Sequence, residues 1–215
     1  MTITKFLIDF VLHLDKHLCQ IITTYGSLTY TLLFVIIFIE TGLVVTPFLP
    51  GDSLLFAAGT FAALQYLNVF WLLFLLSLAA ILGDTVNYWI GHFFGEKMVA
   101  NPHLPIKKEH IAQTQRFFDK HGGKTIILAR FVPIVRTFAP FVAGVGKMHY
   151  GRFISFNVIG GVVWVFLVTL AGFFFGNIPL VKDNFSTVII AIILISVMPM
   201  VIQALINKRE KRKKS

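Results

Sequence analysis

Long apolar segments recur along the sequence and predict an all-α protein that crosses a membrane several times. The segments at residues 69–95, 153–176 and 186–206 are each long enough for one crossing, which takes about 20 apolar residues in a bilayer. Because apolar runs follow one another closely, no water-soluble domain of ordinary size fits between them. We therefore expect one membrane domain over residues 28–206, an all-α polytopic membrane protein.

Two further segments are amphipathic, which predicts helices that lie at the membrane surface. The first spans residues 1–27, in which apolar positions from Ile3 to Ile21 follow helical spacing. The second lies within the basic segment 97–122. We expect both to lie in the interface rather than to cross the bilayer.

Residues 30–64 and 125–149 are apolar but are interrupted by proline, glycine and charged residues. The first falls into two apolar halves, and the second is too short to cross a bilayer twice. Each is therefore expected to enter and leave the membrane on one side, as a re-entrant helical hairpin within the protein. The residues expected at the hairpin tips are Pro47, Pro50, Gly51, Pro133 and Pro140.

A hairpin followed by one crossing occurs twice, which indicates an internal repeat. Matching glycines mark the two copies, namely Gly59 and Gly144 after the proline motifs, then Gly91 with Gly95 and Gly172 with Gly176 at the ends of the crossings. Because a hairpin returns to its starting side whereas a single helix crosses, the second copy begins on the opposite face. We therefore expect an inverted repeat, as in transporters built from broken helices.

Charged residues are few, and their distribution orients the chain. Only 13% of residues are charged, against about 25% in a typical soluble domain, and the formal net charge is +9. Basic residues concentrate in segment 97–152 and in the tail 207–215, so the positive-inside rule places both in the cytoplasm. We expect the tail to meet anionic lipid headgroups rather than nucleic acid.

Five charged residues lie inside apolar segments: Glu40, Asp52, Asp84, Arg130 and Arg136. Each costs roughly 2.5–3.5 kcal/mol at a helix centre on insertion scales, so these side chains must satisfy one another or a ligand. We expect Arg130 and Arg136 to bind an anion, because guanidinium groups match phosphate oxygens, and Glu40 and Asp52 to exchange protons. The alternative is a set of buried salt bridges that only hold the two hairpins together.

Other polar residues carry weaker predictions. Asp84 and Tyr88 lie one helical turn apart, as a hydrogen-bonded packing pair or as a proton relay. The glycine pairs predict close helix packing, and the tryptophans at positions 71, 89 and 164 are interpreted as interfacial or packing residues. The histidines lack metal-ligand spacing, so we expect neither a metal ion nor an organic cofactor.

Three motifs in this order carry a family resemblance. They are Glu40 followed by Pro47-Phe48-Leu49-Pro50-Gly51-Asp52, then Gly83-Asp84 with Tyr88, and then Arg130-Phe131-Val132-Pro133-Ile134-Val135-Arg136. Over about residues 26–180 the chain resembles the DedA family of bacterial inner-membrane proteins, which is related to the eukaryotic SNARE-associated Golgi, or VTT-domain, proteins. The resemblance implies two facing re-entrant hairpins, dependence on the proton-motive force, and functional roles for Glu40, Asp52, Arg130 and Arg136.

Members of that family are implicated in returning undecaprenyl phosphate across the inner membrane, in handling other polar lipids, and in envelope integrity and cell division. The resemblance therefore implies a flippase for a polyprenyl phosphate or another polar lipid. Two alternatives stay open, a proton-coupled exchanger of monovalent cations or cationic drugs and a lipid scramblase or scaffold. We expect no enzymatic activity. A lipid phosphatase needs a histidine near its phosphate-binding arginines, and no histidine lies between Arg130 and Arg136 or close to either in the sequence. The sequence leaves open whether the protein forms a homo-oligomer.

Overall fold

The computed structural model describes the chain over residues 26–43, 51–100, 108–179 and 181. Within these residues the regular structure is helical, without a strand, which confirms the all-α expectation. The predicted crossing at 186–206, the tail at 207–215, Pro47 and Pro50 lie outside the described residues, as does nearly all of the amphipathic helix at 1–27.

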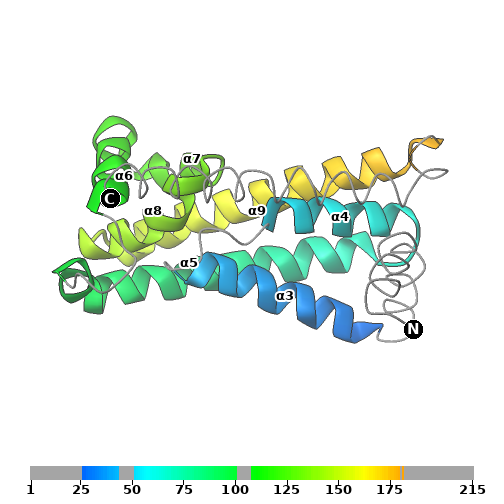
Figure 1. Ribbon diagram of the computed structural model, residues 1–215, viewed down its shortest axis with the longest axis horizontal. Helices are drawn as coiled ribbons and strands as arrows, with labels where there is room; N and C mark the ends of the chain where they lie inside the picture. Colours follow the sequence, from blue (N-terminus) through cyan, green and yellow to red (C-terminus); the bar gives the residue numbers. More distant parts are fainter. Residues whose placement is uncertain (1–25, 44–50, 101–107, 180, 182–215) are drawn as a thin grey trace, which may run out of the picture. The chain divides into compact units, whose positions relative to one another are not determined.

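The helices follow the predicted segments closely. They are α3 Ser27–Gly42, α4 Gly51–Ala63, α5 Val69–Ala100, α6 Lys108–His121, the 3₁₀ helix η1 Gly122–Lys124, α7 Thr125–Ala129, α8 Pro133–Val145 and α9 Tyr150–Gly176 (Figure 1). The stretches Val69–Gly95 and Tyr150–Gly176 have mean hydropathies of 2.1 and 2.4 and are long and apolar enough to cross a membrane. Helices α3 and α4 correspond to the two halves of the first predicted hairpin, and α7 and α8 fall within the second.

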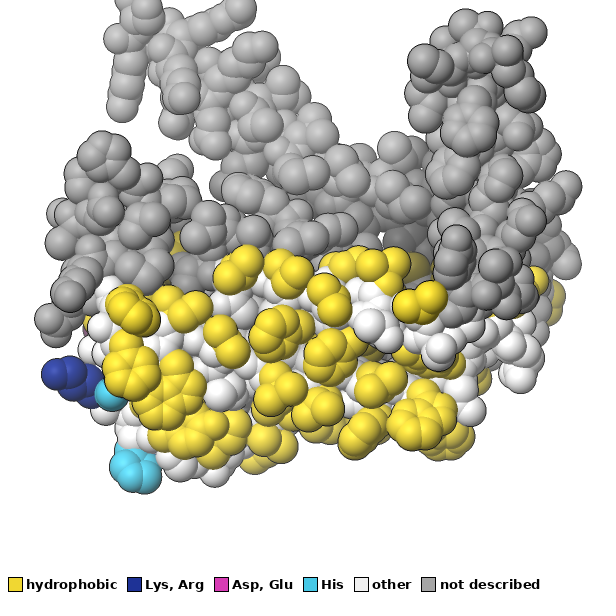
Figure 2. Space-filling view, turned by 90° about the horizontal axis from the view of Figure 1, so that it is seen from below, with side chains coloured by type: hydrophobic (Ala, Val, Ile, Leu, Met, Phe, Trp, Pro, Cys, Tyr) yellow, Lys and Arg dark blue, Asp and Glu magenta, His cyan; other side chains and the backbone are white. Residues whose placement is uncertain are grey.

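Over Val69–Gly95, the outward side of α5 is apolar, whereas Asp84 and Asn87 point inward. Phe70 is 78% exposed and Phe93 is 66% exposed, but Asp84 and Asn87 are buried. Figure 2 shows hydrophobic side chains spread over most of the described surface on the face that it displays. A water-soluble protein has the opposite arrangement, with charged groups outside. Lipid around α5 accounts for it, and the chain is a membrane protein.

The residues form two compact units by their mutual contacts, and each is described by itself. The α4 unit contains, within the described part of the chain, residues 26–29, 51–69, 168–179 and 181. The α8 unit contains residues 30–43, 70–100 and 108–167.

In the α4 unit, glycines bring α4 against the end of α9 at backbone distance. A β-carbon on Gly59 would overlap the carbonyl oxygen of Thr169, and a β-carbon on Gly172 would overlap that of Phe56. The Thr60 hydroxyl also donates to the Gly172 carbonyl at 3.1 Å. This approach leaves no room for a larger residue at either glycine.

In the α8 unit, α8 meets α5 through the same kind of contact. A β-carbon on Gly144 would overlap the carbonyl oxygen of Tyr88, and a β-carbon on Gly91 would overlap that of Phe141. Gly95 faces Val145 in the same way as Gly176 faces Thr60 in the other unit. The predicted close packing at the glycine pairs is confirmed.

The start of α8 is set by Pro133. Val132 has an extended backbone, with φ −120° and ψ 105°, as expected for a residue before proline. Proline suits the first helical position because it needs no amide donor there. The chain between α7 and α8 is therefore broken at residues 130–132.

Pro140 lies inside α8 and not in a turn, so its assignment to the hairpin tip is wrong. A proline removes only one hydrogen bond, the one to the carbonyl four residues earlier. Buried packing around Phe138, Phe141 and Val142 keeps the helix continuous past this residue. By contrast, Gly51 and Pro133 each begin a helix.

Helix α6 forms within the predicted basic amphipathic segment, and its apolar side is covered by protein. Phe117 and Phe118 pack against a buried cluster that includes Ile126, Val135 and Ala139. The segment thereby fixes α7 and α8 (Figure 1).

The glycine contacts predict a position-specific loss of stability. We expect Gly91→Ala and Gly172→Ala each to lower the unfolding free energy by about 1–3 kcal/mol, because the added methyl group forces two helices apart. Gly151→Ala is the control, because a β-carbon there would meet only the His149 ring, at 3.3 Å. Thermal unfolding of the purified protein in detergent measures the difference. Equal melting temperatures for the three variants would contradict the packing described here.

Candidate functional site

Five polar side chains converge inside the α8 unit. Glu40 lies near the end of α3, Asp84 in α5, Arg130 directly after α7, Arg136 in the first turn of α8 and Asn157 in α9. The Arg136 side chain is 13% exposed, and the other four residues are at most 5% exposed. We call Glu40, Asp84, Arg130 and Arg136 the charge cluster.

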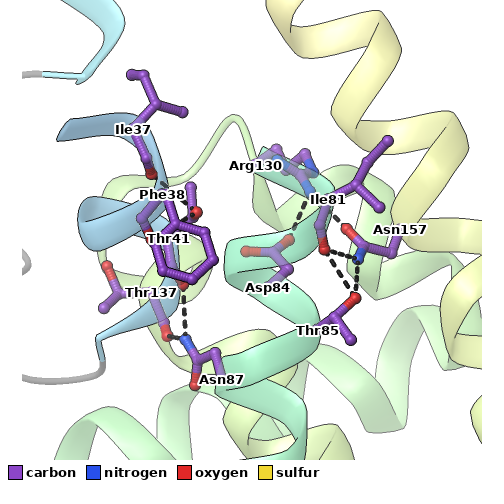
Figure 3. Close-up of polar contacts among 10 residues, drawn as sticks. All are labelled: Ile37, Phe38, Thr41, Ile81, Asp84, Thr85, Asn87, Arg130, Thr137 and Asn157. Carbon is purple, nitrogen blue, oxygen red and sulfur yellow. Dashed lines mark hydrogen bonds and ion pairs between the residues drawn. The ribbon is translucent and has the colours of Figure 1, made fainter. Parts of the chain in front are cut away.

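In the described part of the chain, the guanidinium group of Arg130 makes its hydrogen bonds through a single nitrogen, Nη2. Its Nη2 donates to Oδ2 of Asp84 at 2.5 Å and to Oδ1 of Asn157 at 2.6 Å (Figure 3). Its Nε and Nη1 are buried and have no hydrogen-bond partner among the described residues. A guanidinium group carries five N–H donors, so Arg130 keeps donor capacity that this part of the protein does not use.

Helix α9 supplies the wall against which Arg130 lies. β-Carbons on Gly160 and Gly161 would lie 3.2 Å from its Nε and 3.3 Å from its Nη2. Further along α9, the ring centroid of Trp164 is 5.7 Å from Cζ of Arg130 and 5.0 Å from Cζ of Arg136. Both distances suit a cation–π contact, so one aromatic ring serves both arginines.

Arg136 forms the second ion pair of the charge cluster. Its Nη2 lies 2.5 Å from Oε1 of Glu40. This contact joins a residue of the first predicted hairpin to a residue of the second. With both carboxylates ionised, the four formal charges cancel.

Asn87 fixes the backbone beside the Glu40–Arg136 pair. Its side-chain amide donates to the carbonyl oxygens of Thr41 and Thr137, each at 3.1 Å (Figure 3). Thr41 directly follows Glu40 in the chain, and Thr137 directly follows Arg136. One residue of α5 therefore holds the end of α3 and the start of α8 in register.

Of the two alternatives for Asp84 and Tyr88, the hydrogen-bonded pair is not found among the described residues, and the proton relay stays a prediction. Asp84 binds Arg130, and the Tyr88 hydroxyl donates to the carbonyl oxygen of Met148. The Tyr88 ring stacks on Phe153, with ring centroids 4.4 Å apart. Although Asp84 and Tyr88 lie one turn apart, they face different neighbours, and Asp84 joins the charge cluster.

Asp52 belongs to the α4 unit, where it is exposed in the first turn of α4. Its expected place beside the arginines stays a prediction. No group of three or more His, Cys, Asp or Glu residues able to hold a metal ion occurs in the described ranges.

Sequence reasoning missed three contributors to this site. Asn157 could have been found from the sequence, because it is an amide inside an otherwise apolar crossing. Polar side chains are rare in such segments and usually have partners there. Asn87 lies three residues after Asp84 in α5, but nothing in this spacing indicates its two backbone partners. Trp164 is a buried packing residue, within the earlier interpretation, but its contact with both arginines has no signature in the sequence.

Curated relatives share most of the chain. It is 56% identical over 212 residues to the protein DedA of Escherichia coli strain K12, covering 97% of each chain. It is 41% identical over 171 residues to an uncharacterized membrane protein of Mycobacterium leprae, covering 79% of this chain and 77% of the relative. It is 36% identical over 154 residues to the inner membrane protein YqjA of Escherichia coli strain K12, covering 71% of this chain and 70% of the relative.

The sequence pattern of the VTT domain matches residues 49–174, which include every charged residue of the site except Glu40. No solved structure matches the chain. The match spans more than half of the sequence, and the relatives named above cover 71–97% of the chain at 36–56% identity. The chain therefore belongs to the DedA family of VTT-domain membrane proteins.

Proposed function

We propose that this protein is a proton-coupled transporter that moves a lipid with an anionic phosphate headgroup, such as undecaprenyl phosphate, across the bacterial inner membrane. The observation that carries the proposal is Arg130, which is buried while its Nε and Nη1 have no hydrogen-bond partner in the described residues. A buried donor left without a partner costs about 1–3 kcal/mol. Phosphate oxygens are strong acceptors for such donors.

An amphiphilic cargo also fits the distribution of polarity. The charge cluster is enclosed, whereas α5 and α9 present apolar side chains such as Phe70, Phe74 and Leu167 on their outer sides. A headgroup at the cluster and a hydrocarbon tail in the surrounding lipid satisfy both environments. Free inorganic anions would use only the first of them.

Transport without chemical conversion is the simpler reading of the site. Among the described residues, the side chains found against Arg130 and Arg136 include Glu40, Asp84, Asn157 and Trp164. None of these four is a nucleophile of the histidine or cysteine kind used for phosphate transfer. In the proposal, Glu40 and Asp52 exchange protons, and protonation of Glu40 releases Arg136 toward the headgroup.

We also propose that the fold is an inverted repeat of a re-entrant hairpin and a crossing. The equivalent glycine contacts support this, since Gly59 meets Thr169 as Gly144 meets Tyr88, and Gly172 meets Phe56 as Gly91 meets Phe141. Two copies of one motif would pack alike in this way. The C-terminal tail is cytoplasmic in this arrangement. The relative YqjA is an inner membrane protein by name, which supports the same location for this chain.

The proposed anion site predicts that each arginine is needed for transport. In cells depleted of related proteins, we expect Arg130→Lys and Arg136→Ala to restore at least about tenfold less surface-exposed undecaprenyl phosphate than the unchanged protein, since a hydrogen bond to a charged group contributes about 1.5–3 kcal/mol. Arg152→Ala, an exposed position outside the charge cluster, should restore it fully.

Full restoration by Arg136→Ala would remove the proposal. Purified protein in liposomes separates the alternatives. Proton flux that depends on cations without lipid cargo would indicate a cation exchanger, and lipid exchange without a proton gradient would indicate a scramblase.

Reversing the Glu40–Arg136 pair distinguishes transport from a purely structural staple. Glu40→Arg and Arg136→Glu alone should lower protein level and melting temperature, because each leaves like charges in a buried contact, a change that costs about 3–5 kcal/mol. The double variant should recover stability but not lipid transport, because the headgroup needs the positive charge on α8. Recovery of both properties would assign the pair a structural role alone.

The proposed topology predicts which side of the membrane each hairpin opens to. With the single native cysteine removed by Cys19→Ser, new cysteines at Ser27 and Gln65 should react with an impermeant maleimide added outside the cell. Cysteines at Lys124 and Lys147 should react only after the inner face is opened. All four positions are exposed. Labelling of all four from one side would contradict the inverted repeat.

A further inference from the structure

We propose that Asp84 is the proton-accepting counterion of Arg130, and that an anionic headgroup binds Arg130 by displacing the Asp84 carboxylate as Asp84 takes up a proton. The inference deepens the proposed function and rests on it, since the ligand is the same anion. It assigns proton coupling at Arg130 to a residue of α5 rather than to a hairpin carboxylate.

The first argument is the geometry of the guanidinium group. A guanidinium group offers two forks for bidentate binding, one formed by Nε and Nη2 and the other by Nη1 and Nη2. Nη2 therefore belongs to both forks. In Arg130 this nitrogen is the one that donates to Asp84 and Asn157, while Nε and Nη1 have no described partner. A phosphate can approach either unused nitrogen, but it gains a bidentate grip only when Nη2 is released.

The second argument is which partner of Nη2 can leave. Asn157 is fixed on both sides, because its own amide donates to the Ile81 carbonyl at 3.0 Å and to the Thr85 hydroxyl at 3.4 Å (Figure 3). Asp84 is ionisable, and a carboxyl group that gains a proton no longer competes as an anion for the same donor. Asn157 keeps Arg130 in place while Asp84 and the headgroup exchange.

The third argument is charge balance. Glu40 on α3, Asp84 on α5, Arg130 after α7 and Arg136 on α8 sum to zero when all are ionised, and α9 adds only neutral Asn157 and Trp164 to these contacts. A singly charged anion would leave the buried site with one excess negative charge, which is strongly unfavourable away from water. One proton taken up by a carboxylate cancels that charge.

The proposal fixes the direction of a pH effect. Because the anion and the proton enter together, anion affinity falls as pH rises through the range in which Asp84 loses its proton. By linkage, the bound anion favours the protonated state of Asp84 to the same extent. Full coupling of one proton changes affinity by about tenfold per pH unit.

The test uses the full chain in detergent and dihexyl phosphate, a phosphodiester whose own charge stays constant near neutral pH. Calorimetric titrations should give an affinity for the unchanged protein that rises on acidification toward about tenfold per pH unit. Asp84→Asn, which keeps shape and hydrogen bonding, should bind with an affinity nearly independent of pH. Asp119→Asn, which removes an exposed carboxylate of α6 outside the charge cluster, should retain the pH dependence.

A second measurement does not depend on the Asp84 variant folding. In buffers of different ionisation enthalpy, the unchanged protein and the control Asp119→Asn should each take up close to one proton per dihexyl phosphate bound. No uptake, or uptake that disappears only in Glu40→Gln, would overturn the role of Asp84 and leave the anion site intact. Failure of the unchanged protein to bind dihexyl phosphate at any pH would instead count against the proposed function itself.

Discussion

Each guanidinium group of the site is held at 2.5 Å by one carboxylate, inside helices whose outer sides are apolar. These buried charges are not solvated by bulk water, so each must be paired within the protein. The two ion pairs therefore fix the positions of α3, α5 and the broken segment before α8 relative to one another within the α8 unit. Asn157 and Trp164 add to this from α9. The cluster is thus a structural requirement of the unit and, in the proposed function, also the part that binds the headgroup. Only a change of charge without a change of shape separates these two roles.

Glycine makes such a cluster possible with short side chains. Asp84 and Asn87 reach across to other helices with one methylene group each, which requires that the helices approach closely. Gly83 supplies this on α5, since a β-carbon there would overlap the Thr41 hydroxyl of α3. Gly160 and Gly161 do the same on α9, where they leave room for the guanidinium group of Arg130. Longer side chains in place of Asp84 and Asn87 would have more rotatable bonds, so the positions of their polar groups would be less fixed.

The helices and their glycine contacts could be predicted because they depend on local signals, namely apolar length, a proline at the first turn of α8 and paired glycines. Charged residues in apolar segments also pointed to Glu40, Asp52, Asp84, Arg130 and Arg136 as a group, and four of these, Glu40, Asp84, Arg130 and Arg136, form the charge cluster. Their pairing could not be predicted, since Arg130 binds Asp84 on a crossing helix and Tyr88 turns to Met148, and both choices depend on how the helices are rotated. Asn87 and Trp164 act through the backbone and through a ring face, neither of which leaves a pattern in the sequence.

Pro140 divides α8 into two functional halves. The turn before it carries Arg136, and the turns after it hold Phe141 and Gly144 against α5. Pro140 has no backbone N–H to donate to the carbonyl oxygen of Arg136, so one helical hydrogen bond is missing where these halves join. Bending at that joint breaks one hydrogen bond fewer than it would in an unbroken helix. The missing hydrogen bond therefore lies between the turn that carries Arg136 and the turns that pack against α5 through Phe141 and Gly144.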